Sequence, residues 1–495
     1  MPGRRRARPR STRTARASVT AVTCLLAILL AACGSQLDPD TVATVNGSGT
    51  GAQTGDVPGT GTDPGGGTAP GTDPGGGTAP GGGTDPGGGT GPGAGNGGDP
   101  QGGGGPGDSP PPVSGPQGSC DGFKNGPGIT DKTIVIGNAS DISGPVPGLF
   151  EASQDAVRAF VAYFNASSDI CGRKLAINNY DSRTDAAADQ QAYTRGCDEV
   201  FAMVGSMSAF DSGGASTAQS CGLPDIRSAA VTVDRNKCTT CFGAQSTNTG
   251  EHQNAVADFV LDNYGDSGQH AGFLYINAGA SAENAVRQAN AMQKRGMHFD
   301  YVQGIDISEF NYSPYVQQLK DKNIEVVFWT GAYQQSVRLR QAMQQQGYKP
   351  KLYLRDPTDY TPEYVQSGGD AVDGTVIFTN FVPFEERDSS PELQLYLSWL
   401  NQVKPGATPG FFGVFSWSAA RLFVERAVAL GGKLNRATMI DALRKTDNWT
   451  SQGLTSPQHV GPKRTGDCWR FIELRGGEWR AINGTKYHCS GTTVG

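Results

Sequence analysis

Short β-branched and aliphatic runs alternate with longer helical stretches from residue 120 onwards. Strands are predicted at residues 133–137, 174–179 and 200–204, each followed by a predicted helix, at 150–165, 186–197 and 212–221. After a break near Thr247 the alternation restarts, with predicted strands at 271–276, 301–305, 325–329 and 351–354 and helices at 280–295, 315–320 and 333–347. Strand and helix in alternation indicate parallel sheets covered on both faces. The predicted fold class is therefore α/β, with two doubly wound parallel-sheet lobes joined by a three-segment hinge.

The folded part of the chain is long enough for two lobes. Residues 119–495 exceed the size of one typical core. The alternation breaks at three places, so we expect the chain to cross between lobes near Thr247, Gly374 and Asn448. These crossings predict a first lobe of residues 119–247 and 375–447, and a second lobe of residues 248–374 and 448–495.

The N-terminus has the pattern of an export signal. Seven arginines from Arg4 to Arg16, with no acid among them, precede an apolar run at residues 19–30. A transmembrane anchor is the alternative, but the run is shorter than the roughly 20 residues that span a bilayer. Leu-Ala-Ala-Cys at residues 30–33 resembles the bacterial lipobox, which implies removal of residues 1–32 and acylation of Cys33. We expect a protein anchored by lipid to the outer face of the cell membrane.

Residues 33–118 combine the lipid-modified Cys33 with a segment of mainly Gly, Pro, Thr and Asp. The unit Gly-Thr-Asp-Pro-Gly-Gly-Gly-Thr-Ala-Pro occurs at residues 61–70 and again at 71–80. So little apolar surface cannot offset an ordering cost of about 1–2 kcal/mol per residue, which predicts a disordered tether. Low-complexity drift without a selected length is the alternative.

Charge and motif content exclude several function classes. Loss of residues 1–32 removes seven positive charges and no negative ones, so the formal net charge of −6 becomes about −13. An acidic surface argues against nucleic acid as a partner. The five histidines are not spaced as ligands of one metal, and we expect no metal and no cofactor. The sequence has no Gly-x-Ser-x-Gly, His-Glu-x-x-His or phosphate-binding loop, so we expect no enzyme.

Eight cysteines remain after Cys24 and Cys33 are set aside, and an even number in an exported chain predicts disulfides. Proximity along the chain favours Cys120 with Cys171, Cys197 with Cys221, Cys238 with Cys241, and Cys468 with Cys489. The second pair closes two consecutive helices, which should pack side by side. A redox function is the alternative for the third pair, but that pair follows a fourth strand instead of opening a helix after the first.

Two strand-like runs near the C-terminus predict a hairpin. Residues 468–474 face residues 478–482 across Gly476 and Gly477. We expect this hairpin to return to the second lobe.

Short motifs follow one another in a fixed order through residues 128–445. They are Ile134-Val-Ile-Gly137 with Ser143-Gly144-Pro145, Ala162-Tyr-Phe-Asn165, Gly172-Arg-Lys-Leu175, Tyr180-Asp181 with Asp185, Val204-Gly205-Ser206, Leu223-Pro224 with Ser228, and Val326-Val-Phe-Trp-Thr-Gly331. Their order and spacing resemble the type I periplasmic binding proteins of the leucine/isoleucine/valine-binding group. The resemblance implies a monomeric solute-binding component of an ABC importer, which binds a small molecule between two closing lobes and delivers it to a transporter permease.

Ligands of open parallel sheets bind at the carboxyl ends of the strands. The loop at residues 205–212 leads into a helix, whose free N–H groups favour an anion, although Ser212 is equally an ordinary helix N-cap. The expected ligand-binding residues are Ser143, Gly144, Phe150, Ser206, Ser208, Ala209, Phe210, Ser228, Ala229, Val231, Asn277, Ala278, Thr330, Gly331, Tyr333 and Asp356.

Particular roles are predicted for some of these residues. The resemblance implies that an acid of the second lobe receives a ligand ammonium, and Asp356 is the best-placed acid; an ion pair with Arg355 is the alternative. Phe150, Phe210 and Tyr333 are expected to wall an apolar part of the ligand, with core packing as the alternative for the two phenylalanines. Main-chain groups of residues 206–210 and 228–231 are expected to hold an anionic or carbonyl end.

The chain departs from the family where amino-acid binding is concerned. Members that bind amino acids commonly carry Asp-Tyr-Gly where this chain has Asn277-Ala278-Gly279, so the ligand-facing phenol is missing. Val231 or Thr232 stands where the family has a threonine, and Ala209 lies near the position of a serine. The expected ligand is an amino acid or a related amide or carboxylate compound. A receptor lipoprotein that signals ligand state to a membrane partner is the alternative to an importer.

Overall fold

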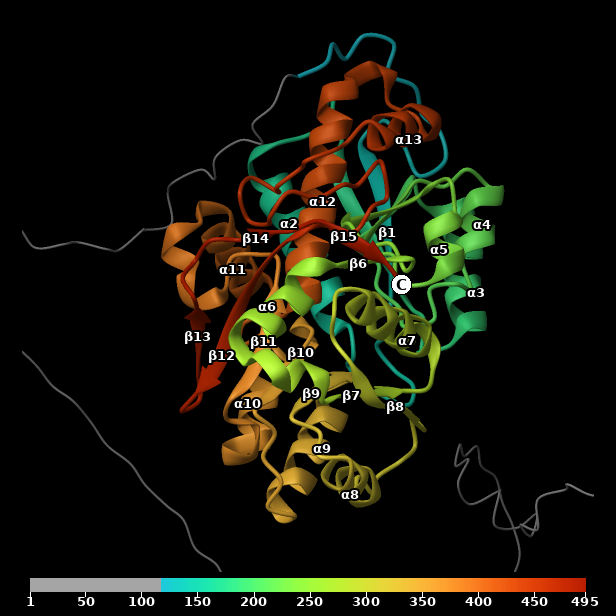
Figure 1. The fold of residues 1–495 in the computed structure, drawn as a ribbon. Helices are drawn as coiled ribbons and strands as arrows, with labels where there is room; N and C mark the ends of the chain where they lie inside the picture. Colours follow the sequence, from blue (N-terminus) through green and yellow to red (C-terminus); the bar gives the residue numbers. More distant parts are fainter. Residues whose placement is uncertain (1–116) are drawn as a thin grey trace, which may run out of the picture. The chain divides into compact units, whose positions relative to one another are not determined.

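The computed structural model describes residues 117–495. The predicted signal peptide, the lipidated Cys33 and nearly all of the predicted tether lie outside the described residues. The described chain is built on two sheets with mainly parallel strands, which confirms the predicted α/β class (Figure 1). Within residues 117–495 no helix has both the length and the apolar character needed to cross a membrane.

The first sheet has five parallel strands in the order β2-β1-β3-β4-β5. Residues of β1 belong to two different core clusters, Ile134 and Ile136 to the one that contains Phe160 and Ala139 to the one that contains Tyr193, so both faces are covered. The strands are β1 Thr133–Ser140, β2 Lys174–Asp181, β3 Ala202–Val204, β4 Asp225–Ala229 and β5 Cys241–Gln245. The helices are α2 Glu151–Ser167, α3 Ala186–Glu199, α4 Ala215–Ser220 and α5 Val233–Lys237.

The second sheet joins five parallel strands to an antiparallel hairpin, in the order β13-β12-β11-β10-β9-β7-β8, with β14 beside β12. Its strands are β7 Ala271–Ile276, β8 Phe299–Ile305, β9 Val326–Thr330, β10 Leu352–Arg355, β11 Thr375–Thr379, β12 Cys468–Arg475, β13 Glu478–Ile482 and β14 His488–Cys489. Its helices are α6 Asn254–Tyr264, α7 Gly279–Lys294, α8 Ser313–Asp321, α9 Tyr333–Gln345 and α10 Pro362–Gly368. The predicted hairpin is confirmed, since β12 and β13 pair from Phe471 with Ile482 to Arg475 with Glu478.

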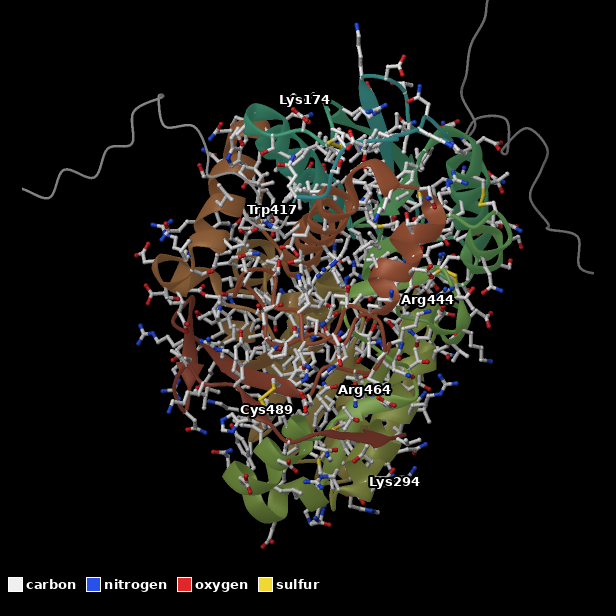
Figure 2. The ribbon with its side chains drawn as sticks, turned by 90° about the horizontal axis from the view of Figure 1, so that it is seen from above. Lys174, Lys294, Trp417, Arg444, Arg464 and Cys489 are labelled. Carbon is white, nitrogen blue, oxygen red and sulfur yellow. A yellow bond between two sulfur atoms is a disulfide. The ribbon has the colours of Figure 1, made fainter. Side chains whose placement is uncertain are left out.

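Three late helices, α11 Pro391–Val403, α12 Phe411–Leu430 and α13 Arg436–Arg444, return to the first sheet. Helix α12 runs beside α2 (Figure 1) and packs on β4 and β5. It is buried around most of its circumference, and Trp417, labelled in Figure 2, is fully buried between Phe160 and Tyr396. The Trp417 indole N–H donates to the Glu392 carboxylate, which also accepts from Arg421. This long helix therefore fixes the loop at its N-terminus relative to the first sheet.

Three segments cross between the lobes and are hydrogen-bonded to one another. The Ser246 N–H donates to Gln458 Oε1 at 2.9 Å, and the Ser456 N–H donates to the Asn380 carbonyl at 2.8 Å. A short separate sheet of β6 Glu251–Gln253 and β15 Thr492–Val494 adjoins the first crossing.

Two of the predicted crossing points are misplaced. Residue 375 was expected to return the chain to the first lobe, but β11 pairs in parallel with β10 of the second sheet. The cause is that β11, buried throughout, continues the second series of strands. The region after Asn448 was expected in the second lobe, but the Trp449 indole donates to Glu425 of α12 at 2.9 Å. The second and third crossings thus come later, at about residues 380–383 and 455–467.

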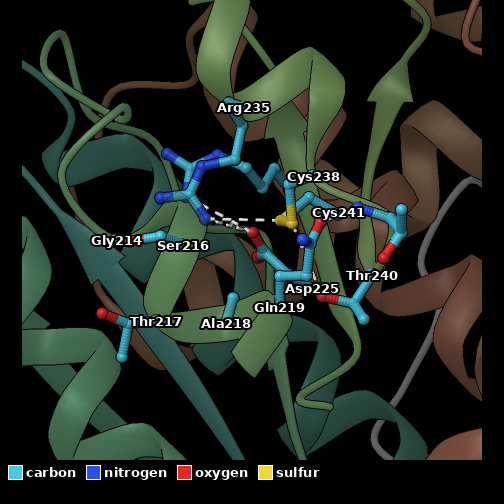
Figure 3. The surroundings of a disulfide bond; sticks show 12 residues. Gly214, Ser216, Thr217, Ala218, Gln219, Asp225, Arg235, Cys238, Thr240 and Cys241 are labelled. Atoms are coloured by element: carbon cyan, nitrogen blue, oxygen red, sulfur yellow. Dashed lines mark hydrogen bonds and ion pairs between the residues drawn. A yellow bond between two sulfur atoms is a disulfide. The ribbon is translucent and has the colours of Figure 1, made fainter. Parts of the chain in front are cut away.

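All four predicted disulfides are present: Cys120–Cys171, Cys197–Cys221, Cys238–Cys241 and Cys468–Cys489. The last appears as the yellow bond at Cys489 in Figure 2. Figure 3 shows Cys238 and Cys241 beside Arg235, which also contacts Asp225. Both sulfur-bearing residues of this pair are buried, so the bond is placed as a structural crosslink of the loop between β4 and β5.

Candidate functional site

A cavity of about 250 Å³ lies where the carboxyl ends of the two sets of parallel strands meet. Loops after β1, β3 and β4 border it on one side, and helix α7, which follows β7, and the loops after β9 and β10 border it on the other. The hinge residues 247–249 and strand β6 complete the wall. Open parallel sheets bind ligands at this end of their strands, so this cavity is the candidate site.

Aromatic side chains form much of the wall. Phe150 meets Phe412 edge to face, with ring centroids 4.6 Å apart, and Phe411 lies 4.6 Å from Phe412. Phe378 and Trp469 contribute from the second sheet, with centroids 5.3 Å apart. A cavity with this wall suits a ligand with an apolar body.

Two aspartates of the protein occupy the N–H groups that were expected to bind an anion. Asp141 Oδ2 accepts from the Ala209 N–H at 2.8 Å, and Asp211 Oδ2 accepts from the Val231 N–H at 2.9 Å. The Phe210 N–H donates to Ser208 Oγ at 3.2 Å. Burial raises the pKa of Asp141, while hydrogen bonds from the Ser182 hydroxyl and from the Ala209 and Thr184 N–H groups oppose the rise. Internal oxygens thus already use these three N–H groups, and the prediction that residues 206–210 and 228–231 hold an anionic ligand end gains no support from them.

Asp356 lines the cavity from the second lobe, at the end of β10. Its side chain is 25 % exposed, and one oxygen accepts from the Thr358 N–H at 2.9 Å. Arg355 lies 3.6 Å from the other oxygen, but the guanidinium makes closer contacts of 2.7 Å with Asp359. Burial acts to lower the pKa of Arg355, yet the two carboxylates outweigh it and raise that pKa. Asp356 therefore borders the cavity, as predicted, and also forms a long ion pair with Arg355.

His252 of β6 lines the cavity with a nitrogen that has no partner. The residue is 8 % exposed, and its buried Nε2 makes no hydrogen bond. Burial, reinforced by the charge of Arg287, lowers the pKa of His252 to about 4. The imidazole is therefore neutral at neutral pH.

A second cavity of about 350 Å³ adjoins the first across Leu149, Thr358, Phe411 and Phe412. It is more polar, and Glu151, Asp155, Glu363 and Lys404 are among its lining residues. Lys404 is paired with both Glu151 and Asp155, at 2.6 and 2.8 Å.

Six of the sixteen predicted ligand-binding residues border the first cavity: Phe150, Ala209, Val231, Thr330, Gly331 and Asp356. Tyr333 borders the second cavity instead. The other nine border neither cavity: Ser143, Gly144, Ser206, Ser208, Phe210, Ser228, Ala229, Asn277 and Ala278.

Three of the predicted serines that border neither cavity have hydroxyls that are hydrogen-bonded within the first lobe. Ser206 Oγ accepts from the Ala139 N–H at 3.0 Å, and Ser228 Oγ donates to the Phe412 carbonyl at 3.1 Å. Ser143 Oγ donates to Asp181 at 2.5 Å. Gly144 is needed for its backbone, with φ of +109° and Arg183 O only 2.3 Å from where a Cβ would stand.

Several lining residues escaped prediction. Phe411 and Phe412 begin helix α12, and nothing in the sequence shows that this late helix packs beside β4. Trp469 lies within a strand of the C-terminal hairpin. Glu251, His252 and Gln253 lie at the hinge. Met207 and Ala230 lie within segments already marked as candidates, at residues 205–212 and 228–231.

Comparisons with known proteins assign the family. The family described as periplasmic binding protein matches residues 133–478. A Leu/Ile/Val-binding protein homolog of Brucella abortus is 20 % identical over 307 residues, which cover 61 % of this chain and 69 % of the relative.

Solved structures show the same fold. The branched-chain amino acid transporter substrate-binding protein of Streptococcus pneumoniae, in complex with isoleucine, is 17 % identical with a TM-score of 0.61, covering 72 % of this chain and 100 % of that one. A fatty acid ABC transporter substrate-binding protein from Thermomonospora curvata is 19 % identical with a TM-score of 0.63, covering 75 % and 96 %. The matched proteins are solute-binding proteins and not enzymes. The chain belongs to the periplasmic binding protein family.

Proposed function

We propose that this chain is the lipid-anchored, extracytoplasmic substrate-binding component of an ABC importer, and that it binds one small molecule in the first cavity. The observation that carries the proposal is the position of that cavity, between the strand ends of two sheets that are joined by three hinge segments. A ligand there contacts both lobes at once.

Contacts across the cavity rim support a closing mechanism. The Ala280 N–H at the start of α7 donates to the Ala209 carbonyl at 2.8 Å. Glu283 Oε2 accepts from the Val233 N–H at 3.0 Å, and Asn284 Nδ2 donates to the Val231 carbonyl at 2.7 Å. We call Ala280, Glu283 and Asn284 the α7 latch. Because its contacts join the two lobes, a ligand that touches both lobes shifts the hinge equilibrium towards the latched form, and a permease can read that form as loaded.

The ligands of structural neighbours agree with an apolar cavity. Neighbours are described with isoleucine, with valine and with 4-hydroxybenzoate, and one is described as a fatty acid transporter protein. Each of these ligands has an apolar body, as the aromatic wall requires. Their polar ends differ, so the polar end of this ligand is set by this cavity's own residues.

The anchor is proposed from the sequence at residues 30–33, outside the described residues. Acylation of Cys33 places the two lobes on the outer face of the membrane, at the end of the tether. A monomer suffices, since both walls of the cavity come from one chain.

A ligand screen tests the proposal. The full chain, purified in detergent, is heated with a panel of amino acids, amides, amines, aromatic acids and fatty acids. A ligand at 100 times its dissociation constant should add about 2.7 kcal/mol to the free energy of unfolding and raise the melting temperature. If no class in the panel shifts the melting temperature, the chain is not a solute-binding protein for these compounds and the proposal fails.

A further inference from the structure

The first cavity presents hydrogen-bond acceptors that lack a donor. Glu251 and His252 border it, and Glu251 Oε2 and His252 Nε2 are buried without a hydrogen-bond partner. A hydrogen bond from the His252 ring to the backbone of Thr249, which acts to raise the pKa of His252, would leave the lone pair of the neutral ring on Nε2. Buried polar atoms are normally paired. Two unpaired acceptors in one wall indicate a ligand that donates.

Four side-chain donors along the same wall are used within the protein. Asn248 Nδ2 donates to the Lys463 carbonyl at 3.1 Å, and the Trp469 indole donates to the Gly466 carbonyl at 2.7 Å. Asn284 and Thr247 likewise donate to backbone carbonyls of the first lobe. A ligand carboxylate would have to displace an internal contact to bind any of these four donors.

The charges around the cavity also favour a hydrogen-bond-donating ligand over an anionic one. Its ionised lining residues are the acids Glu251 and Asp356, and among the described residues no lysine or arginine borders it. Arg355 is fully buried, and its closest ion-pair partner is Asp359. Arg287 acts on His252 electrostatically and has a buried Nη1 without a hydrogen-bond partner, but it is not part of the wall.

We infer that the ligand of this cavity is a molecule with an apolar body and a hydrogen-bond-donating amine or amide end, and without a free carboxylate. Asp356 and the acceptors of β6 receive the donor hydrogens, while the aromatic wall holds the apolar body. A free carboxylate would face Asp356 and Glu251 without a counter-charge, and burial of an unpaired charge is costly. The inference rests on the proposed function and narrows its ligand class.

Matched ligands that differ only in the polar end test the inference. The sets are hexylamine, hexanamide and hexanoate, and phenethylamine, phenylacetamide and phenylacetate, titrated calorimetrically into the full chain at pH 7.5. The amines and amides should bind, with the amine at least about tenfold tighter than the carboxylate of the same set. In Asp356→Asn the amine should lose its advantage over the amide.

The possible contrary results distinguish failure of this inference from failure of the proposed function. Carboxylates that bind as tightly as the amines overturn the inference while leaving the proposed function intact, and loss of that binding in Arg287→Gln would place the anion beside His252. If neither amines nor amides bind, the inference fails; if in addition no compound of the wider panel binds, the proposed function fails with it.

Discussion

The Asp356 carboxylate has two possible roles, a contact with the ligand and an ion pair with Arg355. If its carboxylate meets a charged donor of the ligand, Asp356→Ala should weaken binding by about 1.5–3 kcal/mol. Loss of the 3.6 Å pair with Arg355 alone should leave the dissociation constant unchanged, because Asp359 still neutralises the arginine. Calorimetry on the variant decides, with Asp321→Ala on the exposed surface of α8 as the control. An unchanged dissociation constant removes Asp356 from the site.

Because burial lowers the pKa of His252, we expect the stability of the fold to depend on pH. Its pKa is about 4 in the folded protein, against about 6.5 when unfolded, so the unfolded chain binds the extra proton first. The stabilisation from the neutral ring is complete above pH 6.5 and is lost as pH falls towards 4, by about 3 kcal/mol in total.

Urea unfolding at several pH values between 7 and 4.5 measures this effect. Between those limits the free energy of unfolding should fall more steeply for the wild type than for His252→Gln. The difference between the two slopes of unfolding free energy against pH removes the contributions of the other buried titratable groups, which the two proteins share. His298→Gln, at a side chain that is 57 % exposed, should follow the wild type. Parallel curves for the wild type and His252→Gln would contradict the assigned environment.

Sequence reasoning found the strand-end residues but not their orientation. Phe150, Val231 and Asp356 were located because the end of a strand is readable from its apolar run. Ser206 and Ser228 stand at equally good positions, yet their hydroxyls bond inward, and no pattern along the chain distinguishes inward from outward. Phe412 was missed because its place depends on how α12 packs against α2 and β4, which is a tertiary relation.

At the scale of elements, α7 determines how firmly the lobes meet. Glu283→Ala removes the bond from the Val233 N–H, a contact between the lobes. The variant should weaken ligand binding two- to tenfold, which corresponds to about 0.5–1.5 kcal/mol for one hydrogen bond. Its melting temperature without ligand should change little, because the bond joins lobes that are each folded.

Glu478→Ala is the matched control for the latch. Glu478 is an exposed acid on β13, paired with Arg480, and it belongs to the same lobe as Glu283. Its replacement should leave the dissociation constant unchanged. Equal effects of the two substitutions would show that the latch contributes nothing specific to closure.

Most elements were predictable, because alternation of strand and helix depends on local patterns. The strand at residues 271–276 was predicted with the bounds that the structure gives to β7. The lobe boundary at residue 374 failed, since β11 looks the same along the chain whether it joins one sheet or the other. The disulfide pairing was predictable because each cysteine bonds to the next one along the chain, and three of the four pairs are separated by 24 residues or fewer.

For the whole molecule, the lipid anchor makes the location of the protein testable. Cys33→Ser removes the thiol that would carry the lipid, so cell fractionation should move the protein from the membrane to the soluble extracytoplasmic fraction. The folded part should keep its melting temperature and its ligand, since residue 33 lies far from the cavity in sequence. A Cys33→Ser protein that stays in the membrane fraction would contradict lipid anchoring at this residue.

The central claim is that the ligand lies in the first cavity, between the lobes, and its most direct test is calorimetry on a variant that fills this cavity. Ser281 is half-buried, borders the cavity and lies in the first turn of α7, so Ser281→Trp should occupy the ligand's space without disturbing the core. Asn290→Trp, on the exposed face of the same helix, is the control. We expect Ser281→Trp to abolish binding of the best ligand from the screen, and Asn290→Trp to bind it like the wild type. Unchanged binding by Ser281→Trp would place the ligand elsewhere and contradict the account.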